Sequence, residues 1–191
     1  MDYLCCIMAL TPSQMIPLGT TAPVFKLMQP ADGQWYSLPQ LQGIKGTLIM
    51  FICNHCPYVK HVIPQLIQLS NDYQSRGISF IGISSNDARA YPEDHPDEMR
   101  RISRQEKYPF HYLYDETQET AKAYDASCTP DFFLFDNQLN LVYRGQLDNS
   151  RPGNQVPCTG ESLRMALNNL LTGNMPVKEQ RPSLGCNIKW K

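Results

Sequence analysis

The pattern of apolar and polar positions along the chain switches between two periods. Residues 46–53 (GTLIMFIC) and 78–84 (ISFIGIS) are almost continuously apolar, as strands are when both of their faces are buried in a parallel sheet. Between them, residues 58–73 place apolar side chains three and four positions apart, which is the spacing of one helical face. This order of strand, helix and strand predicts a parallel pair joined by a helix.

Further elements are predicted on either side of this unit. Residues 18–27 and 35–38 predict an opening hairpin around the turn QPADGQ. The middle of the chain predicts a helix near 97–106, a strand at 110–115 and a polar helix at 116–126. The last third predicts an antiparallel hairpin from 131–136 and 141–146, then a helix at 159–173 that Thr159 caps and Gly173 ends.

These elements predict an α/β fold. Parallel pairs in the first half and antiparallel pairs in the second make a mixed central sheet with helices on both faces, extended by an N-terminal β-hairpin. The length of 191 residues suits one domain of about 150 residues with extensions. We place the domain at residues 16–173, an N-terminal extension at 1–15, and a C-terminal tail that wraps the domain at 174–191.

Composition narrows the function classes. The net charge is −1 without a long run of either sign, which gives no support for nucleic acid or an anionic membrane surface as a partner. No stretch approaches the roughly 20 apolar residues of a membrane span. The first residues lack the basic leader of a secretory signal, so a cytoplasmic location is expected. No cofactor is indicated.

Candidate chemistry lies in the motif CNHC, where Cys53 and Cys56 stand at the end of a predicted buried strand and the start of a helix. A helix N-terminus offers unpaired N–H groups and the positive end of the helix dipole, and both stabilise a thiolate. We therefore expect a lowered pKa at Cys53, with a protonated His55 adding to the effect. The spacing also lets the two sulfurs close a disulfide.

Three uses of such a pair have to be weighed: a redox disulfide, a peroxide-reducing cysteine with a companion, and half of a metal site. A structural zinc site needs two further ligands, and the sequence contains no second CxxC and no HxxxH. The strand–helix setting favours redox use. A second signal is Thr129-Pro130 directly before a predicted strand, because proline is excluded from strand interiors and predicts a fixed turn here.

With these motifs the chain resembles the thioredoxin superfamily, and within it the branch that contains the AhpC/TSA peroxiredoxins and the TlpA/ResA-type thiol–disulfide proteins. The resemblance covers about residues 16 to 172. The matching residues are Gly19, Ala22, Pro23 and Phe25, the Cys53 and Cys56 pair, Pro64, Thr129-Pro130, and Gly145. The segments CNHCPYVKH, CTPDFFLFD, YRGQLDNSRPGN and GCNIKWK look like a bacterial family filed under AhpC/TSA or redoxin.

The resemblance implies a thioredoxin-like fold and a thiol–disulfide oxidoreductase. Cys53 would attack a disulfide and Cys56 would resolve the mixed disulfide, while Pro130 and the backbone of Thr129 hold the substrate. The implied partners are a protein or small-molecule disulfide, or a hydroperoxide, and a thiol electron donor. Two alternatives stay open: a peroxiredoxin-like hydroperoxide reductase and a Cys/His metal-binding protein.

The resemblance also brings Cys128 close to the pair. A third thiol there would shuttle disulfides or complete a metal site with Cys53, Cys56 and His55. The alternative is a small buried core residue, because cysteine is often buried. Cys186, in the tail, is expected to be packed or solvated, with a resolving role as the alternative.

The chain also departs from the superfamily pattern. The buried acid expected six residues before the first cysteine is Thr47, which cannot titrate, so proton transfer would use Asp131, His55 or water. A peroxide-binding arginine would have to be Arg144 or Arg151, and both are interpreted as surface charges. The acids around His95 are interpreted as a solvated loop.

Overall fold

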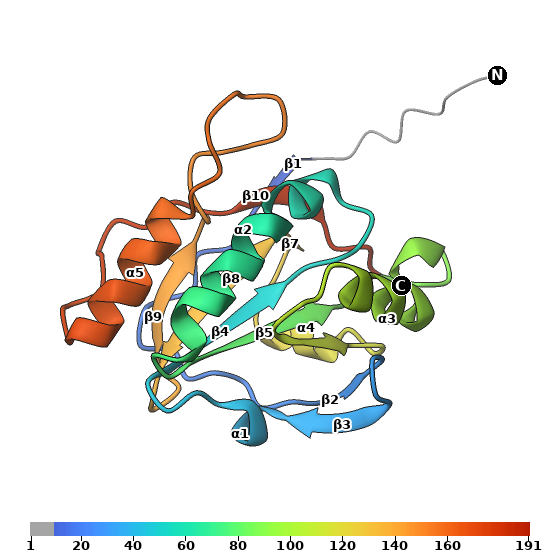
Figure 1. The fold of residues 1–191 in the computed structure, drawn as a ribbon, viewed down its shortest axis with the longest axis horizontal. Coiled ribbons are helices and arrows are strands. Elements are labelled where there is room, and N and C mark those ends of the chain that lie inside the picture. The colour runs from blue at the N-terminus through green and yellow to red at the C-terminus, as the bar shows by residue number, and fades with distance from the viewer. Residues whose placement is uncertain (1–9) are drawn as a thin grey trace.

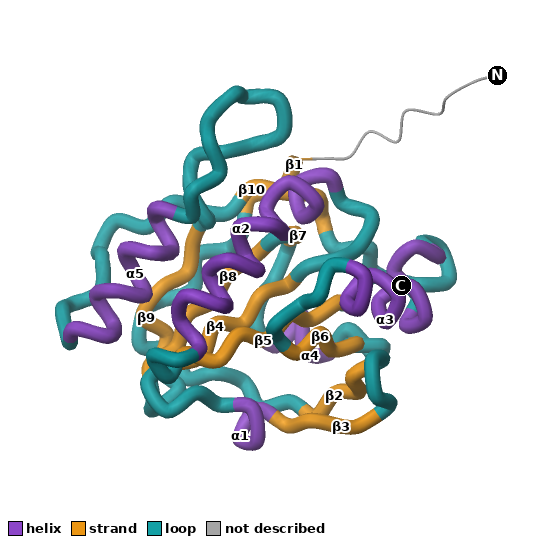
Figure 2. The backbone as a smooth tube through the Cα atoms, in the orientation of Figure 1, coloured by secondary structure: helices purple, strands orange, loops and turns teal. Residues whose placement is uncertain are grey.

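A computed structural model describes residues 10–191, so Cys5 and Cys6 lie outside the described residues. Seven strands form the main sheet (Figures 1 and 2). In spatial order they are β3 (Gln34–Ser37), β2 (Lys26–Gln29), β6 (His111–Tyr114), β5 (Ile78–Ser84), β4 (Gly46–Phe51), β8 (Asp131–Asp136) and β9 (Leu141–Gly145). The helices are α1 (Leu38–Leu41), α2 (Pro57–Gln74), the 3₁₀ turn η1 (Pro92–Asp94), α3 (Pro96–Gln105), α4 (Glu119–Ala123) and α5 (Glu161–Thr172).

The sheet is mixed, which confirms the predicted fold class. Strand β4 runs parallel to β5 and β5 parallel to β6, whereas β4 with β8 and β8 with β9 are antiparallel. Two apolar clusters divide the core: α2 and α5 pack on one face of the sheet, and α1 and α4 pack on the other. Figure 1 shows α2 and α5 in front of the sheet.

Several predicted boundaries differ from the structure; the polar helix expected at 116–126, for example, covers only Glu119–Ala123. The first hairpin strand begins at Lys26 and not at residue 18; before it, Thr21 makes only an isolated bridge to Asn140, because Pro23 in this segment cannot donate to a ladder. Thr159 does not cap the last helix. Instead its amide and that of Gly160 donate to one carboxylate oxygen of Asp148, at 2.8 and 2.7 Å.

A second, three-stranded sheet joins distant parts of the chain. Its order is β1 (Leu10–Pro12), β10 (Leu184–Asn187) and β7 (Cys128–Thr129). Strand β10 comes from the segment expected to wrap the surface, yet Cys186 and Ile188 are each 1% exposed. This part of the tail is therefore built into the core, beside the N-terminal end of α2 (Figure 1).

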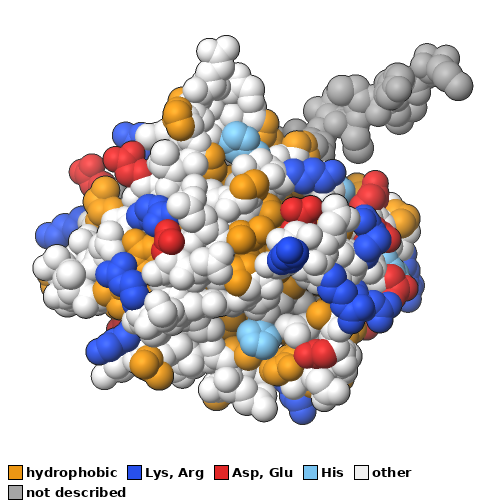
Figure 3. All heavy atoms as spheres, viewed as in Figure 1, with side chains coloured by type: hydrophobic (Ala, Val, Ile, Leu, Met, Phe, Trp, Pro, Cys, Tyr) orange, Lys and Arg blue, Asp and Glu red, His pale blue; other side chains and the backbone are white. Residues whose placement is uncertain are grey.

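The face of the molecule drawn in Figure 3 has no single dominant charge. Figure 3 shows acidic and basic side chains interspersed over this face, with blue side chains grouped over α3, which carries Arg100, Arg101 and Arg104. Among the residues described, no helix is both long enough and apolar enough to cross a bilayer.

Candidate active site

The two cysteines of the CNHC motif lie where a strand ends and a helix begins. Strand β4 ends at Phe51, and Cys56 is the residue that precedes the first turn of α2. Strand β8 starts at Asp131, directly opposite Phe51. The sheet register therefore brings the Thr129–Pro130 turn, whose peptide bond is cis, against the motif.

The sulfur of Cys56 lies at the centre of this site. It is 2.7 Å from the sulfur of Cys186 and 3.3 Å from the carbonyl oxygen of Thr129. As a thiol it can donate to that carbonyl; as a thiolate it accepts from the thiols of Cys186 and Cys53 and from the amides of Val59 and Cys186. These donors, led by Cys186, hold the pKa of Cys56 well below its usual range although burial opposes them.

Cys53 has the opposite character. Burial raises its pKa well above the usual range, and its hydrogen bond to Cys56 and the charge of Asp94 add to the increase. The hydroxyl of Thr129, 3.3 Å from the Cys53 sulfur, only partly opposes this. The predicted lowering at Cys53 is therefore wrong, because Cys56 is the residue placed at the positive end of α2.

The pKa directions predict which sulfur carries the charge. We expect the ultraviolet absorbance of a thiolate to persist well below about pH 8.5, the usual pKa of a cysteine, and to disappear only as acid protonates Cys56. A group whose pKa is lowered by folding stabilises the folded state at pH values above its unfolded pKa, and this contribution is lost as the pH falls through the folded pKa. Absorbance titration of Cys56→Ser should remove this signal, and Cys53→Ser should keep it. Loss of the signal in Cys53→Ser alone would contradict the assignment.

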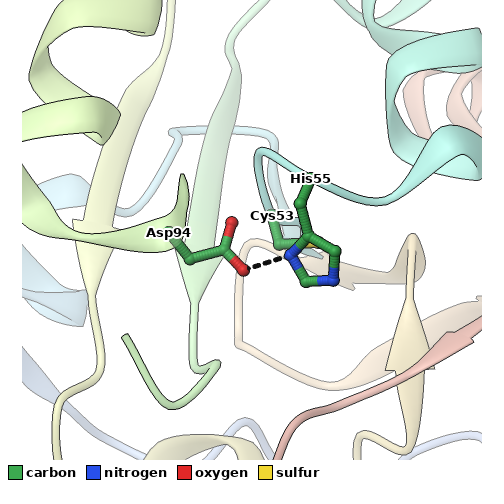
Figure 4. Close-up of side chains that lie close together, drawn as sticks. All are labelled: Cys53, His55 and Asp94. Carbon is green, nitrogen blue, oxygen red and sulfur yellow. Dashed lines mark hydrogen bonds and ion pairs between the residues drawn. The ribbon is translucent and has the colours of Figure 1, made fainter. Parts of the chain in front are cut away.

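The histidine between the two cysteines is held by a buried carboxylate. His55 Nδ1 and Asp94 Oδ2 are 2.6 Å apart, with Cys53 beside them (Figure 4). Asp94 is 0% exposed and also accepts from the amide of Asn54 at 2.6 Å and the side-chain amide of Asn86 at 2.7 Å. The hydrogen bond to Asp94 raises the pKa of His55. The dyad thus offers a proton next to the sulfurs.

Asp94 was missed by the sequence analysis. The acids near His95 were expected to be solvated, and Asp97 is indeed 66% exposed, but Asp94 is fully buried at the end of η1. The polar and proline residues around Asp94 in the sequence are those of a solvated loop, so they do not distinguish this buried acid from the exposed ones. The useful signal was His55 itself, because a histidine beside a buried cysteine pair calls for a partner that fixes its orientation.

A metal ion is the other use of this cluster. Among the described residues, Cys53, His55 and Asp94 place their ligand atoms within 4.8 Å of one another. The donors are one sulfur, one nitrogen and one carboxylate, a mixture found at zinc sites. The predicted set with Cys128 is not formed. Asp94 already accepts three hydrogen bonds, so the arrangement fits an acid–base dyad better than a metal centre.

Cys128 is a buried core residue. It is 0% exposed, and its sulfur lies 3.7 Å from the carbonyl oxygen of Pro130, two residues along the chain. Burial raises the pKa of Cys128, which keeps it a thiol. Of the two interpretations offered for Cys128, the packing one fits this environment.

Asp131 and Arg144 form an ion pair inside the protein. The guanidinium and carboxylate are 3.3 Å apart, and both side chains are 0% exposed. Arg144 also lies over the ring of Phe133, with its Cζ 4.5 Å from the ring centroid. Burial raises the pKa of Asp131 to about 7, although Arg144 opposes the increase. The interpretation of Arg144 as a surface charge is wrong.

Arg151 braces the loop that follows β9. Its guanidinium donates to the carbonyl oxygens of Asp148 and Ser150 and to the side chain of Gln146, each at 2.7 Å. In the part of the chain that the structure covers, neither Arg144 nor Arg151 makes a hydrogen bond to a site cysteine.

An open cavity of about 410 Å³ leads to Cys53. It lies between α2 and α3, with apolar side chains such as Val59, Ile63 and Ile102 in its lining and charged ones such as Lys60 and Arg101 as well. Cys56 and Cys186 are not among its lining residues. A substrate entering here therefore meets Cys53 first.

Comparison with solved structures supports this architecture. An uncharacterized conserved protein from Geobacillus kaustophilus is 55% identical, with a TM-score of 0.94 over 96% of this chain and 97% of that one. A hypothetical protein from Sinorhizobium meliloti 1021 is 42% identical, with a TM-score of 0.92 over 95% and 98%. No curated protein matches the chain.

A more distant solved structure shares the fold. A putative thiol:disulfide interchange protein DsbE from Chlorobium tepidum is 20% identical, with a TM-score of 0.64 over 82% of this chain and 99% of that one. At this identity the likeness establishes the thioredoxin-like fold. The family model of AhpC/TSA matches residues 18–144, which include the CNHC motif and the Thr129–Pro130 turn. The chain therefore belongs to the AhpC/TSA family.

Proposed function

We propose that the protein is a thiol–disulfide oxidoreductase whose working pair is Cys53 and Cys56. The observation that carries the proposal is the placement of two neighbouring cysteines directly before α2 and against Thr129, with the pKa of Cys56 lowered and that of Cys53 raised. A thiolate is the attacking species in disulfide exchange, and a neighbouring thiol is needed to release the mixed disulfide. Membership of a redox family and the thioredoxin-like fold point in the same direction.

The roles of the two cysteines are the reverse of those expected from the sequence. Cys56 is 0% exposed and lies outside the cavity that Cys53 lines, so this scheme requires the start of α2 to open before reaction. The Cys56 thiolate then attacks one sulfur of a substrate disulfide, forms a mixed disulfide and releases the other sulfur as a thiolate. Cys53 then loses its proton and attacks the Cys56 sulfur, which releases the second substrate thiolate. The substrate disulfide is reduced to two thiols, and the protein dithiol is oxidised to a disulfide that a thiol donor reduces again.

His55 handles the protons in this scheme. Its pKa is raised by Asp94, so near neutral pH it can give a proton to a departing thiolate and take one back from Cys53. The His55–Asp94 dyad thus performs the proton transfer that the superfamily pattern assigns to an acid at the position of Thr47. The backbone of Thr129, which was expected to bind an extended substrate, lies beside Cys56 but is paired with β10 at Cys186.

A second candidate, reduction of hydroperoxides, is favoured by the same lowered pKa. Cys56 directly precedes Pro57 at the start of α2, and a thiolate there would be oxidised to a sulfenic acid that Cys53 condenses to a disulfide. Against it, both arginines that were expected to bind a peroxide are engaged elsewhere, Arg144 with Asp131 and Arg151 with the loop after β9.

One experiment separates the two. We expect the protein to accelerate the reduction of insulin disulfides by dithiothreitol, and Cys53→Ser/Cys56→Ser to remove the acceleration. Cys158→Ser, which changes a half-buried cysteine outside the site, should retain it. Hydrogen peroxide consumption, measured in parallel, should stay close to the rate of free cysteine. An insulin rate equal to that of dithiothreitol alone would refute the proposal, and rapid peroxide consumption would favour the second candidate.

A further inference from the structure

A third cysteine, from the other end of the chain, reaches the proposed pair. Cys186 lies on β10, and its sulfur is 2.7 Å from that of Cys56. Cys53 also hydrogen-bonds to Cys56. Cys56 therefore has a thiol neighbour on either side, one next to the cavity and one on the C-terminal strand.

The backbone fixes Cys186 in this position. In the three-stranded sheet Cys186 is paired with Thr129 on one side and with Leu10 on the other. The approach of β10 to Thr129 is so close that a Cβ on Gly185 would lie 2.1 Å from the Thr129 carbonyl oxygen, which only glycine avoids. The contact between the sulfurs is therefore set by a strand register and not by a loose terminus.

The residues after β10 strengthen this placement. The amide of Ile188 donates to the carbonyl oxygen of Ser127 at 3.1 Å, and the amide of Lys189 donates to the side chain of Asn86 at 2.8 Å. Asn86 in turn donates to Asp94, the partner of His55. The C-terminal segment is thus bonded to the same network that surrounds the site cysteines.

The charge distribution suits an exchange at Cys56. The hydrogen bond between Cys186 and Cys56 is the largest cause of the raised pKa of Cys186, and burial and the charge of Cys56 add to the increase. Cys186 is therefore a thiol while Cys56 is a thiolate. Once Cys56 enters a disulfide it is neutral, so its hydrogen bond with Cys186 and its charge no longer raise the pKa of Cys186. Lys189, which lowers this pKa, then has a larger net effect. Cys186 becomes a better nucleophile when Cys56 becomes a target.

We propose that Cys186 is a third redox cysteine, and that it replaces Cys53 as the disulfide partner of Cys56. The oxidised protein then alternates between a Cys53–Cys56 and a Cys56–Cys186 disulfide. This inference rests on the proposed function, because a substrate disulfide must first oxidise the pair.

The exchange step is balanced within the chain. The Cys186 thiolate attacks the Cys56 sulfur, and the bond between Cys53 and Cys56 breaks as the bond between Cys56 and Cys186 forms. The electron pair leaves on Cys53, which takes up the proton that Cys186 lost. No further oxidant is consumed, and Cys53 returns as a thiol to the cavity while the disulfide lies with the C-terminal strand.

The disulfides can be mapped without altering the protein. The reduced wild-type protein is oxidised with glutathione disulfide, the remaining thiols are alkylated in acid, and the digest is analysed by mass spectrometry without reduction. Trypsin places Cys53 and Cys56 together in residues 46–60 and Cys186 alone in residues 179–189. We expect two products: residues 46–60 with an internal disulfide, and the same segment joined to residues 179–189.

Variants then identify the sulfurs. In Cys53→Ser, the joined product should be nearly the only oxidised form, at least tenfold more abundant than the mixed disulfide of Cys56 with glutathione. Cys186→Ser should give only the internal disulfide, and Cys158→Ser should match the wild type. If Cys53→Ser keeps glutathione on Cys56 while Cys186 is alkylated, and no joined product forms in the wild type, the relay is refuted although the proposed function stands. If the wild type forms neither disulfide, the proposed function itself fails.

Discussion

Replacing Cys56 with serine is expected to lower the rate of disulfide reduction by about 10³-fold or more, as removal of an attacking nucleophile does in other enzymes. The reason is that Cys56 holds the thiolate, whereas burial and the neighbouring charges keep Cys53 protonated. Serine has nearly the same shape, but its hydroxyl does not ionise in this range. The insulin assay, with the variant and the wild type at equal concentration, measures the loss.

The matched variant is Cys53→Ser, which leaves the nucleophile in place. It should still react with glutathione disulfide: the attack by Cys56 releases one glutathione per protein, Cys186 releases a second as it resolves the mixed disulfide, and further turnover is slow because the usual resolving thiol is missing. A stoichiometric first turnover in Cys53→Ser together with none in Cys56→Ser supports the assignment. The opposite result, a first turnover only in Cys56→Ser, would return the attacking role to Cys53, as the sequence had suggested.

The parts of this site that could be predicted from the sequence are those that local sequence patterns indicate. A continuous apolar run followed by a helical period places Cys53 and Cys56 at a strand end and a helix start. A proline before an apolar run predicts the turn at Pro130. Both signals lie within a few residues of the feature they predict, and the mixed sheet then brings the two together.

The parts that could not be predicted depend on contacts between distant segments. Cys186 is 130 positions from Cys56, and its four-residue strand carries no periodicity that distinguishes it from a tail. Asp94 and Arg144 were assigned to the surface because charged residues usually lie there. Each is instead buried against a partner, Asp94 with His55 and Arg144 with Asp131. The error over Cys53 arose because the effect of the helix N-terminus was assigned to the first cysteine, whereas Cys56 is the residue that directly precedes α2.

The buried ion pair gives the largest expected effect on stability. Arg144→Ala should lower the free energy of unfolding by about 3–5 kcal/mol near neutral to basic pH, because it leaves the carboxylate of Asp131 buried without its partner. Arg144 and Asp131 are both 0% exposed, so water cannot replace the missing charge. Arg101→Ala, which breaks an exposed pair with Glu98 on α3, is the control and should leave the stability nearly unchanged.

The pH dependence of this loss tests its cause. Burial raises the pKa of Asp131 to about 7 in the folded protein, against about 3.9 in an unfolded chain. Between these values the folded state binds a proton that the unfolded state has released, so this contribution to stability is present below about pH 4 and lost as the pH rises through 7. At about pH 5 Asp131 is largely neutral, and Arg144→Ala then costs mainly the packing against Phe133. Urea unfolding at pH 5 and pH 8 should therefore show a smaller difference between variant and wild type at the lower pH. A loss that is equal at both would mean that Arg144 stabilises the fold by packing alone, and the carboxylate of Asp131 would have no part in it.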